Sequence, residues 1–314
     1  MTKSITRRDF LKQTGLAGGG LIFLPLGRIL TNGFWEEHAW VDKAGKAPYW
    51  NMSPGVAVGE GVRANYPVIH LFDQRMYVAL TEQHADKELI RIYVFDENLK
   101  QAGSRTALSD FPINSRPFLG SDGQHLYVFW LRKSGKNGEI VFQDINQISD
   151  TPPKILAKGS GNSGWIRTAA SPDGDMMVVW QDGSQKPYQC RYSLFKDGKP
   201  GPVQTLKSDF PVRHPDVIFG GDAFYVAAEY GVKDFQSQIY LSRISKKGNP
   251  DETIRITDHP AGNYHPSLAL LSTGDIALAY YSPRKGKQHW DCLLYTSDAA
   301  DELDGVDLGG RRII

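Results

Sequence analysis

Five residues of types suited to proton transfer and anion binding occupy the same place in five similar segments. Each stands immediately before a proline or threonine that leads into a short apolar segment, and they are Tyr66, Arg116, Arg167, His214 and His265. Arginine binds a carboxylate through two parallel hydrogen bonds. Histidine and tyrosine can act as base and acid. These residue types predict a site for an acidic sugar.

A second group of polar residues follows the next apolar segment of each unit. Asp182, Glu229 and Tyr230 are the members that we expect at the same site, with Glu82, His84 and Arg132 nearby. A polysaccharide lyase needs an arginine for the uronate carboxylate, a base and an acid, whereas a glycoside hydrolase needs two carboxylates. Both sets are present, so both reactions stay open. The alternative is that these side chains only hold strand ends together, in a propeller that binds or scaffolds without catalysis.

The elements that must position these residues form an internal repeat. The five segments recur every 47 to 51 residues, and each continues through a tight turn, a second apolar strand, a polar loop, a third strand and a short fourth strand. The turn pairs tolerate positive φ angles, and they are Asp73-Gln74, Asp122-Gly123, Asp173-Gly174, Gly220-Gly221 and Thr273-Gly274. Four antiparallel strands in each unit of about 50 residues predict an all-β fold, a β-propeller. A β-sandwich is the alternative, but its strands would not recur at a fixed period.

Large aromatic residues end the second strands of three units. We expect Trp130, Trp180 and Tyr280 to pack between blades rather than to stack on sugar rings. Trp165 lies in a loop beside the expected site, where packing and ligand contact are equally open. The propeller is expected to span residues 55–291, with about five blades visible and the fifth stopping as its third strand begins.

The N-terminal segment predicts export. Arg7-Arg8 is followed by Phe10-Leu11-Lys12 and then by a weakly apolar, glycine-rich stretch, which resembles a twin-arginine signal. We therefore expect residues 1–31 to be a signal peptide, the only part to meet a membrane. The mature protein would be periplasmic or secreted. Residues 32–54 predict an irregular leading segment.

The C-terminal segment has a different character. Residues 292–314 resemble the translation of a transposase-type sequencing-library adaptor, with a variable index within 302–305. We therefore expect the native sequence to stop near Asp291.

Composition excludes several classes of protein. The formal net charge of +1 argues against a protein that coats nucleic acid. Two cysteines exclude a disulfide framework and a four-cysteine zinc site. Neither His-Glu-x-x-His nor a P-loop nor a dinucleotide fingerprint occurs, so we expect no metal and no cofactor. A glycan or another small polar ligand is the expected partner.

The repeat, the Asp-Gly hairpins and the export motif together resemble the BNR-repeat, sialidase-like superfamily of bacterial propellers. That resemblance covers about residues 55–291, and it implies carbohydrate binding or processing. Sialidases carry Ser-x-Asp-x-Gly-x-x-Trp boxes, and the nearest segment here, Ser171-Pro172-Asp173-Gly174, lacks the residue between Asp and Gly. An Arg-Ile-Pro motif is absent as well, so the resemblance does not imply sialidase activity itself.

Overall fold

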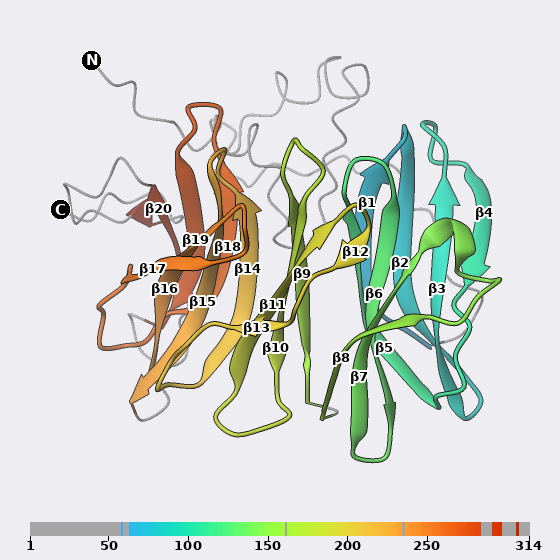
Figure 1. The fold of residues 1–314 in the computed structure, drawn as a ribbon, viewed down its shortest axis with the longest axis horizontal. Coiled ribbons are helices and arrows are strands. Elements are labelled where there is room, and N and C mark those ends of the chain that lie inside the picture. The colour runs from blue at the N-terminus through green and yellow to red at the C-terminus, as the bar shows by residue number, and fades with distance from the viewer. Residues whose placement is uncertain are drawn as a thin grey trace, which may run out of the picture.

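Five antiparallel sheets follow one another along the chain. The computed structural model describes Val58 and residues 63–160, 162–233, 236–283, 291–296 and 306–307. The expected signal peptide, leading segment and residues 55–57 lie outside these ranges. Figure 1 shows the sheets side by side in chain order, from the blue-green first sheet to the orange-red fifth.

Each sheet is built from consecutive strands. The first contains β1 (Arg63–Phe72), β2 (Arg75–His84), β3 (Lys87–Phe95) and β4 (Gln101–Thr106). The second contains β5 (Ile113–Ser121), β6 (Leu126–Ser134), β7 (Asn137–Asp144) and β8 (Lys154–Ser160), with a 3₁₀ turn, η1 (Ile145–Gln147), before β8. The third contains β9 (Gly164–Ala170), β10 (Met176–Asp182), β11 (Gln189–Lys196), β12 (Lys199–Pro200) and β13 (Gln204–Thr205). The fourth contains β14 (Val212–Phe219), β15 (Ala223–Lys233), β16 (Gln236–Ser245) and β17 (Pro250–Arg255). The fifth contains β18 (Tyr264–Leu270), β19 (Ile276–Ser282), β20 (Asp291–Thr296) and β21 (Val306–Asp307).

The hairpin turns between the first two strands of the sheets have the backbone that their residues predict. Asp73 and Gln74 both have positive φ, at 48° and 57°. The other four turns place a glycine at φ between 89° and 93°, and these glycines are Gly123, Gly174, Gly221 and Gly274. Glycine adopts this conformation without steric cost, so the turns fix where each second strand begins.

The core lies between consecutive sheets. Four apolar clusters each draw side chains from two neighbouring sheets. Trp130 lies fully buried between the first and second sheets, Trp180 between the second and third, and Tyr280 between the fourth and fifth. The predicted packing role of these three aromatics is therefore confirmed.

The first strands of the sheets share one centre. β1 contacts β5, β5 contacts β9, β9 contacts β14, and β14 contacts β18. Each sheet thus presents its first strand inward and its fourth strand outward. The architecture is a β-propeller of four-stranded antiparallel blades, as the repeat predicts.

The fifth sheet extends beyond the place where the sequence-based prediction ends it. β20 pairs with β19 through Cys292 opposite Tyr281, and β21 pairs with β20 through Val306 opposite Leu294. Residues within 292–314 thus supply the third and fourth strands, while the foreign origin of this segment stays a prediction. In the described residues, no helix has the length and apolar character needed to cross a membrane.

Candidate functional site

Each first strand contains a β-bulge, and in four of the five sheets the bulge residue is the one that the repeat singles out. The pairing with the second strand shifts register at this point in all five sheets. The residue at the bulge has a φ angle between 46° and 56° in every sheet, and these bulge residues are Tyr66, Arg116, Trp165, His214 and His265. Positive φ strains any residue other than glycine by about 1–3 kcal/mol. A bulge re-aims a side chain, so the same strained device orients one side chain from each blade.

The structure shifts the alignment of the third unit by two residues, from Arg167 to Trp165. Arg167 pairs with Val179 beyond the bulge, whereas Trp165 holds the bulge position. The third unit has no proline after its bulge, and Ile166 stands there instead; aligning Thr168 with the prolines was therefore wrong. With Ile166 in that place, the steps from Pro117 and to Pro215 are both 49 residues. The true counterparts of Arg167 in the other blades are Val68, Phe118, Asp216 and Ser267.

The bulge residues form one continuous cluster, which we call the bulge cluster. The Arg116 guanidinium lies 5.8 Å from the centre of the Tyr66 ring, and it packs against Gly164, where an added Cβ would lie 2.8 Å from Nη1. The rings of Trp165 and His214 meet edge to face at a centroid distance of 4.4 Å. The His214 and His265 rings stack at 3.9 Å. Of the predicted site residues, Tyr66 and Arg116 therefore form one pair and His214 and His265 another, and Gly164 with Trp165 lies between the two pairs.

Glu229 lies beneath the two histidines. Its Oε1 atom is 2.6 Å from His214 Nδ1 and also accepts the backbone N–H of His265 at 2.6 Å. The carboxylate is buried, since Glu229 is only 2% exposed. Burial lowers the pKa of His265, and the adjacent His214 lowers it further, against the opposing effect of Glu229. The site thus combines His265, an imidazole of lowered pKa, with His214, an imidazole that is hydrogen-bonded to a buried carboxylate.

Arg167 lies two residues beyond the bulge in β9, and its guanidinium is 5.9 Å from the centre of the Trp165 ring. Its Nε is 3.8 Å from Oδ1 of Asp216, its counterpart in the next blade, and its guanidinium lies 5.0 Å from the Phe118 ring centre. Asp216 Oδ2 also accepts the N–H of Leu268 from the fifth sheet at 2.7 Å. Burial raises the pKa of Asp216, although these hydrogen bonds and Arg167 oppose the rise. Arg167 and Asp216 therefore form an ion pair beside Trp165 of the bulge cluster.

Asp182 and Tyr230 lie elsewhere. Asp182 Oδ2 is 2.8 Å from Arg191 Nε, and its Oδ1 accepts from Ser163 and from the N–H of Ser184, so it holds the loops around the third bulge. Tyr230 packs between the third and fourth sheets, where burial raises its pKa to about 12. Neither residue has a described contact with the bulge cluster.

A metal ion could be bound only after a rearrangement. The donor atoms of His214, Glu229 and His265 all lie within 4.8 Å of one another, a set that the sequence analysis missed. The lone pair of an imidazole lies in the plane of its ring, and zinc is bound at about 2.0–2.2 Å. The two rings stack with 19° between their planes, so their lone pairs cannot meet at one ion until one ring turns. The present geometry favours hydrogen bonding.

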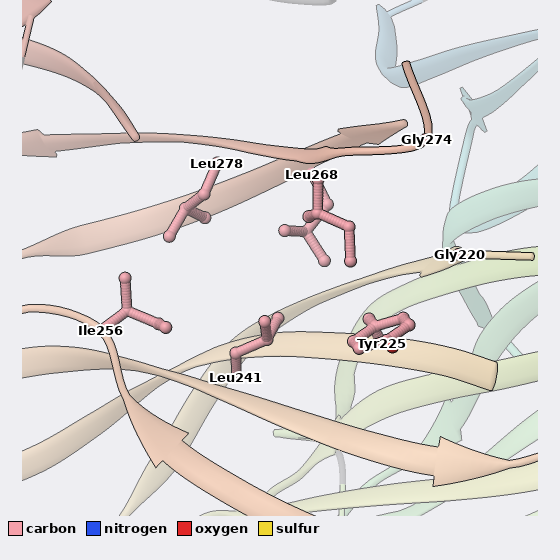
Figure 2. A pocket seen from close by; sticks show the side chains of 8 residues that line it. Gly220, Tyr225, Leu241, Ile256, Leu268, Gly274 and Leu278 are labelled. Carbon is pink, nitrogen blue, oxygen red and sulfur yellow. The ribbon is translucent and has the colours of Figure 1, made fainter. Parts of the chain in front are cut away.

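An apolar cavity of about 280 Å³ lies apart from this cluster, between the fourth and fifth sheets. Figure 2 shows Leu241 and Ile256 on one side of it and Leu268 and Leu278 on the other. These side chains offer no charged group to a polar ligand. The cavity lies between two blades and has an apolar lining.

Comparisons with known proteins show a similarity of fold to solved structures. No family model matches this chain, and no curated protein matches it. The polysaccharide lyase Uly1 superposes with a TM-score of 0.50 at 10% identity, over 83% of this chain and 64% of the lyase. A thermostable family-43 glycoside hydrolase gives a TM-score of 0.44 at 12% identity, over 82% and 96% of the two chains. A subtype N10 neuraminidase-like protein of A/little yellow-shouldered bat/Guatemala/060/2010 gives 0.45 at 11% identity, over 62% of this chain and 58% of that protein.

Proposed function

We propose that the bulge cluster binds a uronate-containing polysaccharide and cleaves it by β-elimination. The observation that carries this proposal is which charged side chains of the site are already paired with each other. Glu229 and Asp216, the carboxylates that contact the centre, are each engaged by a histidine or an arginine. In the described part of the chain, no carboxylate forms an ion pair with Arg116. An arginine without a carboxylate partner lies beside a phenol, in the same set of bulges as two imidazoles, and this combination suits an anionic sugar.

Elimination assigns a role to each group. Arg116 pairs with the uronate carboxylate and stabilises the charge that develops when the neighbouring C5 proton leaves. An imidazole of the cluster takes that proton, the C4–O bond breaks, and a C4=C5 double bond forms. Tyr66, whose ring is half exposed, gives a proton to the departing oxygen. Hydrolysis would instead need two carboxylates facing the glycosidic bond, and the engaged Glu229 and Asp216 do not offer them.

A second candidate is a propeller that binds without catalysis or that only scaffolds partners. Its support is the packing within the cluster, since Trp165 contacts both histidines and so braces three blades. Export through the twin-arginine pathway to the periplasm or beyond is part of either proposal. Its support is the Arg7-Arg8 motif.

Arg116→Ala in the full chain tests the function. The matched control is Arg213→Ala, because Arg213 is exposed, stacks on Tyr188 and adjoins the bulge without joining the cluster. We expect wild type and Arg213→Ala to bind polyuronates and to produce the ultraviolet absorbance of an unsaturated sugar. Arg116→Ala should bind at least about tenfold more weakly, since a charged hydrogen bond contributes about 1.5–3 kcal/mol. Binding without product would favour the second candidate, and equal binding by both variants would reject the site.

A further inference from the structure

Glu229 makes two contacts that belong to different blades. One is the hydrogen bond with His214 Nδ1 within the fourth sheet, and the other is the N–H of His265 in the fifth. Glu229 stands opposite Arg213, the residue before the bulge. A buried carboxylate is costly unless hydrogen bonds compensate for lost water, so its presence here calls for a reason.

The neighbouring blade shows that bridging needs no charge. Gln181 is the counterpart of Glu229, because it stands opposite Gly164, the residue before the third bulge. Its Oε1 accepts the N–H of His214 in the next blade at 3.2 Å. Leu131 occupies the same place in the second sheet and cannot accept a hydrogen bond at all. An amide therefore suffices for the bridge, and the bridge is dispensable at one junction.

The charge of Glu229 acts on His214. A carboxylate only accepts hydrogen bonds, so the proton between the two groups is on His214 Nδ1. In the neutral imidazole the lone pair is then on Nε2, which is the atom free to meet a substrate. The stacked His265, itself stacked on Tyr281 at 5.0 Å, holds the plane of the His214 ring.

We propose that Glu229 is a positioning residue that makes His214 Nε2 the base of the elimination. This inference rests on the proposed function, and it selects His214 rather than His265 for proton abstraction. When Nε2 takes the C5 proton, the imidazole becomes positively charged. Glu229 stabilises that cation across the Nδ1 hydrogen bond.

The test is Glu229→Gln in the full chain. Glutamine can keep an oxygen in the place of Oε1, which accepts from both His214 Nδ1 and the His265 N–H, so the substitution removes the charge while it keeps the acceptor. We expect kcat on polyuronate to fall about 100-fold or more, with KM within about threefold. The control is Glu82→Gln, since Glu82 is equally buried and bound to His84 but lies outside the cluster. Its kcat should equal that of wild type.

The position of the proton on His214 can be measured by spectroscopy without any turnover of substrate. Two-bond ¹H–¹⁵N spectra should show the His214 proton on Nδ1 in wild type. A His214 proton on Nε2 in wild type, or an unchanged kcat in Glu229→Gln of an active enzyme, would overturn the positioning role and leave the proposed function standing. Loss of wild-type activity in EDTA with recovery on zinc would overturn it too, in favour of a metal held by the same three residues. A wild type that neither binds nor cleaves polyuronates would reject the function, while the tautomer result still decides the role of Glu229.

Discussion

Replacing Trp165 with glycine should leave a more stable protein than replacing it with alanine, the reverse of the usual order in a β-strand. Both variants lose the ring contacts with His214 at 4.4 Å and with His265 at 5.3 Å, which contribute about 1 kcal/mol each. They also lose the Arg167 guanidinium at 5.9 Å from the ring centre, which adds about 0.5 kcal/mol. The free energy of unfolding should therefore fall by roughly 2–3 kcal/mol in both.

The difference between the two variants comes from the backbone. Residue 165 has a φ angle of 54°, where alanine is strained by about 1–2 kcal/mol and glycine is not. The greater freedom of glycine in the unfolded chain offsets about 0.5–1 kcal/mol of that advantage. The glycine variant should thus be the more stable by about 0.5–1 kcal/mol.

Urea unfolding of the full chain measures this difference as a shift in midpoint at constant slope. Ala169→Gly is the control, because Ala169 lies in the same strand β9 but is not among the residues with positive φ. That exchange should cost the usual 0.5–1 kcal/mol or so. If alanine equals or exceeds glycine at position 165, the backbone there is not left-handed, and the equivalence of the five bulges is refuted.

Three further predictions concern packing and titration. Gly120→Ala should destabilise the fold by about 2 kcal/mol in urea, because its Cβ would lie 2.8 Å from Cβ of Thr168, whereas Gly103→Ala, with open space around it, should stay within about 0.5 kcal/mol. Because the pKa of His265 is lowered in the folded protein, the unfolded chain binds more protons than the folded protein does as pH falls below 6.5. The free energy of unfolding should therefore fall with falling pH in that range, and His265→Phe should reduce the decline. An equal slope in both proteins would contradict this. Burial alone would raise the pKa of Glu82, but hydrogen bonds, first among them that of Tyr93, lower it below 4.5. Its contribution is present above pH 4.5 and lost as pH falls further, so Glu82→Gln should reduce the acid sensitivity measured by thermal melts at stepped pH, and a variant as acid-sensitive as wild type would count against it.

The fold was predictable because its signals are local and repeated. Turn pairs such as Asp122-Gly123 and apolar strands ending in Trp130 or Trp180 are visible in the sequence itself. Their recurrence at about 50 residues predicts the blades before any pairing is known. Register is different, because it depends on which residues of two strands face each other. In four units a proline follows the bulge residue, and this proline was used to align the repeats. Trp165 could not be recognised in this way, because Ile166 and not a proline follows it.

The site was predictable in part. Glu229 and Tyr230 are adjacent in one strand, and adjacent strand residues point to opposite faces. The alternation alone implies that only one of the pair can face the centre, but the sequence does not say which. The link from Glu229 to both histidines joins residues up to 36 positions apart, and only the packing of two blades creates it.

The fold alone does not account for the residue types at the bulges. If the bulge served only to bend each first strand, glycine would relieve about 1–3 kcal/mol of strain at each position. None of the five is glycine; the chain holds a tyrosine, an arginine, a tryptophan and two histidines there. The five blades share the backbone device but not the side chain, so architecture does not dictate these residue types. Arg116 also has no ion-pair partner among the described residues, and this leaves a cation at the centre that an anionic ligand would neutralise.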